Sequence, residues 1–233
     1  MRTARRPASL PLEERPIKGA PVALLDSAKM FELSRGSVLV REGQALDYWF
    51  LLVAGALRLS CTAGSGRAAT LAILAPGDIL SPGVRGALAP EARAVTSSAG
   101  LRFSSADLDR ALERDPDVIT WVHRAFQRQV DDLRRSLVRV LSLRVHDRVF
   151  DLLCELAGIH GQPVSGGVRI GLPLAQETVA SLVGATRESV NRSIRRLEAG
   201  GLIRRSSRGY VLLDQRSVEP APSGLGPSRR TNR

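Results

Sequence analysis

The stretch VGATRESVNRSIRRL, residues 183–197, decides the fold of the C-terminal part of this chain. An apolar segment ends at Gly184, which suits the C-terminal turn of a helix, and Thr186 is a preferred N-cap for a second helix. On a helical wheel at about 100° per residue, the polar and apolar residues of the second helix separate onto opposite faces. The apolar face comprises Val190, Ile194 and Leu197. The pattern therefore predicts two helices joined by a tight turn, with the second helix resting on a core through one face.

The polar face of this second helix carries side chains of the kinds that recognise bases. Those that fall within about 140° of arc, opposite the apolar residues, are Arg187, Glu188, Asn191 and Arg192. In the major groove, arginine pairs with guanine, glutamate with cytosine and asparagine with adenine. A solvated face would explain one or two arginines, but an ordered set above a matching apolar face favours a DNA-recognition helix. We predict that all four residues contact bases.

Two short strands joined by a basic turn are predicted directly after this helix, at residues 202–205 and 210–214. Strands in this position indicate the wing of a winged helix-turn-helix. Its basic side chains would contact phosphates, which orient a protein on DNA without reading sequence. The residues predicted to contact phosphates are Thr186, Ser189, Arg195, Arg204, Arg205 and Arg208.

Residues 31–102 are predicted to form a β domain. Short runs of strand-forming residues are separated by glycine turns, at residues 37–41, 48–53, 56–61, 69–74 and 92–97. Many short strands with regular turn signals are typical of a closed or sandwich-like β domain. Residues 158–167, which follow a later helix, are expected to form a loop.

A long helix is predicted to begin after Asp115-Pro116, because proline is favoured in the first turn of a helix. Its apolar residues recur every three or four positions, at Ile119, Val122, Phe126, Val130, Leu133, Leu137 and Val140. Such a seam packs either on its own domain or on a second copy of the helix. Its length and its place between two domains favour a dimer interface formed by these seven residues.

The composition excludes several classes of protein. No apolar run approaches membrane-spanning length, and the first residues lack the apolar stretch of a secretion signal. We therefore expect a cytoplasmic protein with no membrane partner. The formal net charge of +11 suits a polyanionic partner.

The sequence offers no metal or catalytic motif. Cys61 and Cys154 are too few for the four or so thiolates of an iron–sulfur cluster and are expected to be reduced thiols, with redox sensing by either left open. The chain lacks a phosphate loop, a nucleophile elbow and metal-spaced histidines or cysteines. We therefore expect no cofactor, no metal and no catalytic residue, and the chain is not expected to be an enzyme.

The order of β domain, long helix and winged helix-turn-helix resembles the cyclic-AMP receptor protein/FNR (CRP/FNR) family of bacterial transcription regulators. The N-terminal likeness rests on Gly36, REGQ at 41–44, Gly55 and PGD at 76–78, and the C-terminal likeness rests on LVG at 182–184, TRESV at 186–190 and Arg192. This resemblance implies a homodimer on double-stranded DNA, with 5′-GTGA-like half-sites arranged as a palindromic operator. It also implies RNA polymerase as a partner.

The sensor half departs from family members that bind cyclic AMP. Those members carry a glutamate after the Gly-Asp turn, where this chain has Pro82. They also carry an Arg-Ser/Thr-Ala run and a Thr-Ser pair on the long helix, but Arg93 lacks the flanking hydroxyl residue and Leu133-Arg134 replace the pair. A buried cyclic phosphate would be poorly compensated here, so cyclic AMP is not expected to bind. Arg93 is the candidate contact for a different effector.

The sequence thus predicts an α+β protein with a cyclic-nucleotide-binding-like β-roll (a double-stranded β-helix or jelly roll), a long dimerisation helix and a winged helix-turn-helix. The expected boundaries are a basic disordered tail at 1–22, the sensor at 23–114, the dimerisation helix at 115–141, the DNA-binding domain at 142–214 and a second tail at 215–233. The expected function is sequence-specific regulation of transcription, with control by an unidentified effector left open. The alternatives are a regulator that binds DNA without any ligand and an adaptor whose winged helix binds protein or RNA.

Overall fold

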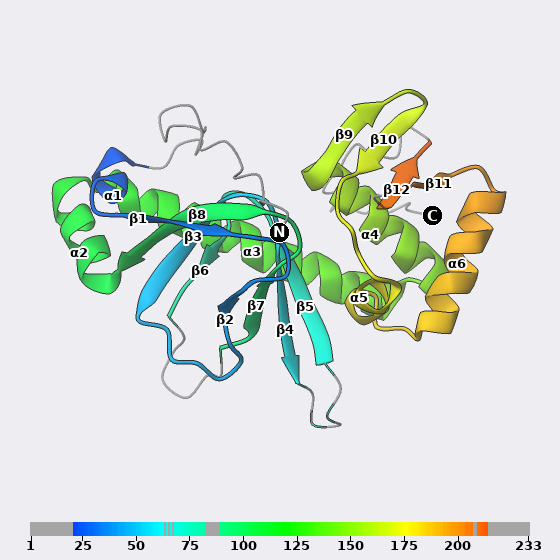
Figure 1. Cartoon of the computed structure of the whole chain (residues 1–233), viewed down its shortest axis with the longest axis horizontal. Coiled ribbons are helices and arrows are strands. Elements are labelled where there is room, and N and C mark those ends of the chain that lie inside the picture. The colour runs from blue at the N-terminus through cyan, green and yellow to red at the C-terminus, as the bar shows by residue number, and fades with distance from the viewer. Residues whose placement is uncertain are drawn as a thin grey trace, which may run out of the picture.

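The chain forms a β-rich N-terminal part and a mixed C-terminal part, which the long helix α3 connects (Figure 1). The computed structural model describes residues 21–62, 64, 66, 68–82, 89–206 and 209–213. The tails expected at 1–22 and 215–233 lie outside the described residues except for Pro21 and Val22, and Val22 begins the short helix α1 (Val22–Leu25). The expected α+β class, with a β-roll, a long helix and a winged helix-turn-helix, is confirmed.

Within the described residues, the N-terminal part consists of two four-stranded antiparallel sheets. The first sheet has the order β1-β8-β3-β6 and the second has the order β2-β7-β4-β5. Apart from the β4–β5 hairpin, successive strands alternate between the two sheets, so the chain rolls up around a shared interior. The strands are β1 (Lys29–Leu33), β2 (Val38–Val40), β3 (Tyr48–Ala54), β4 (Leu57–Thr62), β5 (Ala68–Leu74), β6 (Ile79–Leu80), β7 (Glu91–Ala94) and β8 (Ser98–Ser104).

Three of these strands, β1, β6 and β8, are missed by the sequence pattern. Strand β6 is only 2 residues long, too short for any alternation to show. Strand β8 lies between β1 and β3 and is buried along most of its length, so it has no polar face. It contains Gly100 because a Cβ there would collide with the carbonyl of Leu51 and the ring of Phe31. Close backbone approach therefore outweighs the weak strand propensity of glycine.

Two apolar clusters hold the β-roll and α3 together. The first lies between the sheets and comprises Val40, Leu52, Leu57, Leu74, Leu80, Ala92 and Ala94. The second lies between the first sheet and the helices, where Leu51, Leu101 and Phe103 pack against Val118 and Ala125 of α3. One flank of α3 is therefore part of the sensor core.

Helices α2 (Ser105–Arg114) and α3 (Asp117–Ser142) follow β8 directly. Helix α2 begins with a capping box, in which Ser104 and Asp107 satisfy each other's backbone N–H groups. Helix α3 has 26 residues and is therefore about 39 Å long at 1.5 Å per residue. It passes behind the sheets and reaches the C-terminal part (Figure 1).

A buried arginine fixes the junction between α3 and helix α4 (Val145–His160). The side chain of Arg139 is only 3% exposed; its Nε donates to Asp151 Oδ2 at 2.6 Å and its Nη2 donates to Glu155 Oε2. Between the helices, Leu143 is extended, with φ −102° and ψ 153°. The two carboxylates compensate the buried guanidinium and thereby fix the angle at which α4 leaves α3.

The C-terminal part surrounds a four-stranded sheet of order β11-β12-β10-β9. The expectation of a loop at residues 158–167 is wrong: α4 continues to His160, and β9 (Gly161–Val164) pairs with β10 (Gly167–Ile170) as a hairpin. Gly, Gln, Pro and Ser in this stretch resemble a loop, but pairing of β10 with β12 supplies the missing order. The other elements are α5 (Gln176–Leu182), α6 (Arg187–Ala199), β11 (Ile203–Ser206) and β12 (Gly209–Leu212).

The two parts of the chain contact each other directly as well as through α3. The backbone N–H of Thr70 on β5 donates to Ser181 Oγ on α5 at 2.5 Å. Ala56 of the β-roll is fully buried in the core of the C-terminal part, and Ile73 and Val95 pack against that core. The position of α5 is therefore fixed by the sensor as well as by its own domain.

We predict that the Arg139 cluster responds asymmetrically to substitution. The double variant Asp151→Asn/Glu155→Gln leaves a buried guanidinium without a counter-charge and should lower the free energy of unfolding by about 3–5 kcal/mol. Arg139→Met should cost less, because the side chains of Asp151 and Glu155 are 52% and 22% exposed and can regain water. Urea unfolding followed by circular dichroism measures both, with Arg124→Met on the exposed side of α3 as the control. Equal losses in the two variants would contradict this account.

Candidate nucleic-acid interface

The α5–turn–α6 unit is built from local backbone signals. Gly184, with φ +59°, forms the left-handed turn after α5. Thr186 is the N-cap of α6, and its Oγ1 accepts from the N–H of Ser189 at 3.2 Å. Helix α5 has no such cap, because Ala175 occupies the N-cap position. The turn at Gly184 and the N-cap at Thr186 are as the sequence predicts.

The inner face of α6 is completely buried. Val190 and Ile194 are 0% exposed and Leu197 is 1% exposed, within the core that α4, α5 and the sheet share. This confirms the apolar face predicted from the sequence. Because such a face cannot slide or rotate without opening a cavity, the opposite side of α6 is held in one orientation.

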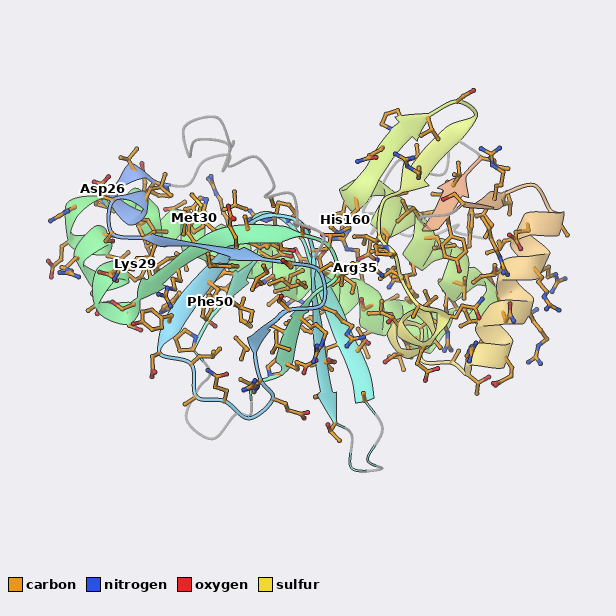
Figure 2. The ribbon with its side chains drawn as sticks, in the orientation of Figure 1. Asp26, Lys29, Met30, Arg35, Phe50 and His160 are labelled. Carbon is orange, nitrogen blue, oxygen red and sulfur yellow. The ribbon has the colours of Figure 1, made fainter. Side chains whose placement is uncertain are left out.

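The outer face of α6 is exposed and predominantly basic. Nitrogen-tipped side chains project from it away from the rest of the domain (Figure 2). The exposed residues here are Arg187, Glu188, Arg192, Arg195 and Arg196. Arg192 Nη2 donates to Ser189 Oγ at 3.0 Å, which keeps its side chain along the helix. A hydrogen bond to its own backbone, aided by the Thr186 hydroxyl and by Arg187 and Arg192, lowers the pKa of Glu188, so its carboxylate is an acceptor at neutral pH.

Asn191 differs from the other predicted base contacts because it is half-buried. Its Oδ1 lies 3.4 Å from Gln176 Nε2 on α5 and 3.4 Å from Arg205 Nη2 on β11. The structure thus places Asn191 where α5, α6 and β11 meet. Its side chain links these elements, and the sequence pattern alone gives no sign of this.

The wing brings further basic side chains beside α6. Arg204 and Arg205 on β11 are both exposed, and Arg205 Nε pairs with Glu198 Oε1 at 3.0 Å. Thr186 is exposed and Ser189 is half-buried at the N-terminus of α6. Arg208, the remaining predicted phosphate contact, lies outside the described residues.

Arg148 on α4 holds the turn between α5 and α6, a contact that the sequence analysis missed. Its Nη1 donates to the carbonyl of Val183 at 3.1 Å, and its Nε donates to the carbonyl of Leu143 at 2.8 Å. One side chain therefore connects the α3–α4 junction with the turn that precedes α6. Periodicity could not reveal it, because an arginine at a polar helical position is ordinarily solvated.

The predicted dimer seam divides into two sets of residues. Ile119, Val130, Leu133 and Leu137 are exposed, as an interface in a monomeric chain must be. Val122, by contrast, is buried, and Phe126 is half-buried against the sensor core. Val140 packs beside Gly184, 3.4 Å from the position of a Cβ there.

These contacts show that the seven residues of the predicted seam do not share one environment. Val122, Phe126 and Val140 lie on the flank of α3 that faces its own chain, whereas the exposed stripe continues through Leu141, which is 74% exposed. A spacing of three or four residues fits both faces of a helix that is half covered, so the sequence could not separate them.

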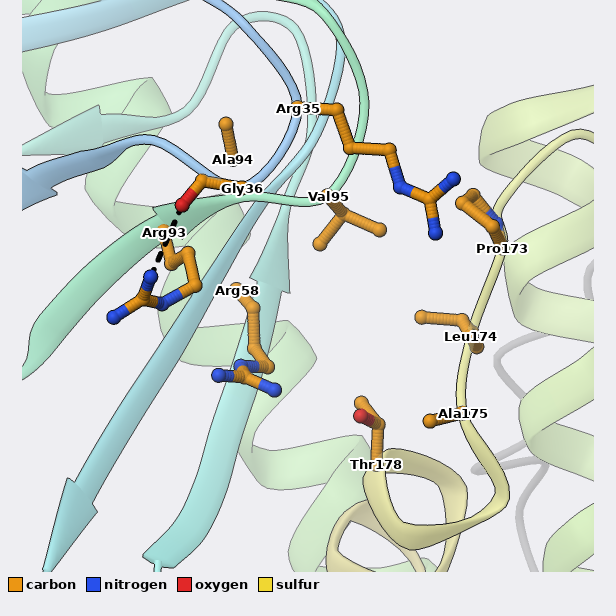
Figure 3. Close-up of a pocket in the computed structure, with 10 residues that line it drawn as sticks. All are labelled: Arg35, Gly36, Arg58, Arg93, Ala94, Val95, Pro173, Leu174, Ala175 and Thr178. Atoms are coloured by element: carbon orange, nitrogen blue, oxygen red, sulfur yellow. Dashed lines mark hydrogen bonds between the residues drawn. The ribbon is translucent and has the colours of Figure 1, made fainter.

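The predicted effector contact, Arg93 on β7, is already paired. Its Nε and Nη2 donate to the two oxygens of Glu91 at 2.9 and 2.8 Å, and its Nη1 donates to the carbonyl of Gly36 at 3.0 Å. The hydrogen bond from Arg93 lowers the pKa of Glu91. Arg93 lies on the side of the β-roll that faces the C-terminal part and not between the two sheets (Figure 3).

Comparison with known proteins agrees with this geometry. Residues 30–115 match the cyclic nucleotide-binding domain family, and residues 147–219 match the Crp-like helix-turn-helix domain family. A relative in Mycobacterium tuberculosis, the CRP-like cAMP-activated global transcriptional regulator, is 28% identical over 204 residues, which cover 84% of this chain and 88% of that protein. The chain belongs to the CRP/FNR family of transcription regulators. Regulators of this family bind DNA and dimerise.

Solved CRP/FNR structures share the whole fold. FixK2 from Bradyrhizobium japonicum has a TM-score of 0.68 at 20% identity, over 82% of this chain and 95% of that chain. The c-di-GMP responsive regulator CLP of Xanthomonas campestris has a TM-score of 0.70 at 19% identity, over 83% and 97%. The curated relatives also include the nitrogen fixation regulation protein FixK of Bradyrhizobium diazoefficiens, 24% identical over 80% of this chain and 78% of that protein.

Metal-ligating clusters and membrane-spanning helices are both absent from the described part of this CRP/FNR regulator. No group of three or more His, Cys, Asp or Glu side chains in those residues is placed to hold a metal ion. Cys61 and Cys154 are each half-buried. Burial lowers the pKa of His160, at the end of α4. None of the described helices is both long and apolar enough to cross a membrane.

We predict different consequences for two substitutions on α6. Arg187→Ala should weaken specific DNA binding by about 1–3 kcal/mol and relax the preference at one guanine, because we predict that this exposed arginine contacts a base. Asn191→Ala should instead weaken binding without changing which bases are preferred, because Asn191 positions α6 against α5 and β11. Selection from randomised duplexes measures both preferences. A uniform loss on every sequence from Arg187→Ala would reassign that residue to phosphate contact.

Proposed function

We propose that this regulator is a homodimer that reads an inverted repeat of GTGA-like half-sites in double-stranded DNA through α6. The observation that carries this proposal is the division of α6 between a fully buried apolar face and an exposed face with Arg187, Glu188 and Arg192. These three side chains offer the contacts for guanine and cytosine that such a half-site requires. The Oδ1 of Asn191 accepts hydrogen bonds from Gln176 on α5 and Arg205 on β11, so we assign it a positioning role.

The phosphate contacts frame this recognition surface. Arg195, Arg204 and Arg205 are exposed beside α6, and Thr186 and Ser189 cap its N-terminus, where backbone N–H groups attract an anion. Together with Arg208, they would orient the domain without reading sequence. Arg205 is partly neutralised by Glu198, so Arg204 is the stronger candidate of the two for a phosphate contact.

Two recognition helices must lie about one DNA turn apart, roughly 34 Å, to read both half-sites. The exposed stripe of α3 supplies the contact that sets this spacing. Leu133, Leu137 and Leu141 are 56%, 58% and 74% exposed on one face of a helix that ends at the DNA-binding part. Large apolar groups gathered in this way favour a second copy of the helix as the partner.

The effector remains a separate question from DNA recognition. The mycobacterial relative is named as cAMP-activated, but this chain has Pro82 and exposed Leu133 where family members that bind cyclic AMP carry polar contacts. Arg93 is occupied by Glu91 and lies outside the interior of the roll. We therefore propose that cyclic AMP does not control this protein, and that either another ligand does or the protein binds DNA without one.

We also propose RNA polymerase as a partner and the cytoplasm as the site of action, because both follow from the proposed role in bacterial transcription.

An adaptor that binds protein or RNA would also use an exposed basic helix. It would not need the glutamate that remains charged among arginines on the outer face of α6, which favours base reading. For the same reason DNA binding is preferred over that alternative.

We predict that the purified, ligand-free chain binds a duplex carrying TGTGA-N6-TCACA more tightly than a scrambled duplex at about 0.15 M salt. Base contacts from both subunits make the specific complex stronger than the phosphate contacts alone, by about a thousandfold or more. Fluorescence anisotropy measures both affinities. Equal binding to the two duplexes, together with no sequence emerging from selection on random duplexes, would exclude the proposed reading of DNA.

We predict that Leu137→Asp converts the dimer into a monomer, because it buries a charge in the apolar contact between two α3 helices. Sedimentation equilibrium should show the loss, and binding to the palindrome should fall while the circular dichroism spectrum is retained. The matched control is Gln127→Asp, an exposed polar position on the same helix. A dimer that survives Leu137→Asp would place the interface elsewhere.

A further inference from the structure

A small pocket lies between the β-roll and the segment that leads into α5 (Figure 3). It has a volume of about 150 Å³, which corresponds to the liquid volume of roughly five water molecules. From the β-roll it is lined by Arg35, Arg58 and Arg93, and from the C-terminal part it is lined by Pro173, Leu174, Ala175 and Thr178. Both halves of the protein therefore form its walls.

The pocket carries an excess of positive charge. Three arginines from three separate segments line it, and Glu91 pairs with two of them, Arg58 and Arg93. Arg93 is saturated by Glu91 and the Gly36 carbonyl. Arg58 has only a loose pair with Glu91, at 3.9 Å, and its Nε is buried without a hydrogen-bond partner. Arg35 extends across the opening toward Pro173 (Figure 3).

The C-terminal wall adds a neutral donor opposite these arginines. Thr178 on α5 lines the pocket and is 6% exposed, so its hydroxyl is largely removed from solvent. Glu177, the neighbouring acidic residue, is not among the lining residues. Guanidinium and hydroxyl donors on opposite walls of a small pocket suit an oxyanion with several acceptor oxygens.

We propose that this pocket binds a phosphate group, either as the free ion or as the phosphate of a small metabolite, and that the bound group bridges the β-roll and α5. Arg58 and Arg35 would donate to it from the β-roll, and Thr178 would donate from α5. The volume of about 150 Å³ is below the roughly 300–1,000 Å³ of sites that enclose a drug-sized ligand, so the pocket suits a small group. The open side leaves room for the remainder of a metabolite outside the pocket.

Occupation of this pocket would act on α6 through α5. Helix α5 already contacts β5 through the Thr70–Ser181 hydrogen bond, and its C-terminus leads directly into the turn before α6. An anion held between Arg58 and Thr178 strengthens that docking and lowers the freedom of α6 relative to α3. The sensor would thus influence DNA reading across the surface between the two parts.

Isothermal titration calorimetry of the full chain without DNA tests the site, whether or not the proposed operator is correct. Inorganic phosphate, added at constant ionic strength against chloride, should give saturable binding of one ion per chain. Arg58→Gln should weaken it about tenfold, because a charge-assisted hydrogen bond is lost. Arg41→Gln, at an exposed arginine outside the pocket, should leave it unchanged. No saturable heat, or an equal loss in both variants, would overturn the proposal.

Further titrations test whether the anion bridges the β-roll and α5, and distinguish the free ion from a nucleotide and from the DNA backbone. Thr178→Val, which preserves shape, should weaken binding about threefold if α5 contributes a donor, whereas unchanged binding would exclude the bridge. Adenosine 5′-monophosphate in place of phosphate distinguishes a nucleotide from the free ion, and tighter binding that still depends on Arg58 would assign a nucleotide. Loss of phosphate binding when a scrambled duplex is added would assign the pocket to the DNA backbone and overturn the proposal of a small anion.

Discussion

The buried guanidinium of Arg139 is the constraint on which the arrangement of the two parts depends. Its removal from water is costly unless both Asp151 and Glu155 stay in place, and those carboxylates lie on α4 while the arginine lies on α3. A helix junction held only by apolar contacts could adopt several angles of similar energy. A charge that must meet two partners permits far fewer, so the cluster selects one geometry for the DNA-binding part.

Arg148 extends this constraint to the recognition helix. Its side chain donates hydrogen bonds to the carbonyl of Leu143, at the end of α3, and to the carbonyl of Val183, in the turn after α5. Movement at the α3–α4 junction is therefore transmitted to the start of α6. The fully buried face of α6 prevents the helix from absorbing such movement by rolling. The orientation of the reading surface is therefore set both by polar contacts at the junction and by packing in the core.

The sequence was sufficient where a local rule decides the structure. Gly184, Thr186 and the spacing of Val190, Ile194 and Leu197 each act through the backbone or through one helix face, and the structure contains all of them as predicted. It was insufficient where a residue serves a partner distant in sequence. Arg139, Arg148 and Asn191 all look like solvated polar residues, but each is fixed by contacts 12 to 35 positions away. The seam on α3 was only partly resolved for a related reason, since Val122 and Leu133 obey one periodicity but Val122 is buried in its own chain and Leu133 is exposed.

In the sensor half, Arg35, Arg58 and Arg93 lie at the boundary with the C-terminal part. The interior of the β-roll is filled by apolar side chains, among them Val40, Leu52, Leu57 and Leu74. The arginines of β4 and β7 instead point to the surface that α5 covers, where the local dielectric constant is lower than in bulk water and a fixed anion interacts more strongly. Charge at this boundary acts on the docking of α5 directly, whereas a ligand inside the roll would have to act through α3. A regulator with this distribution of charge is therefore better suited to sense an anion between its two parts than inside its β-roll.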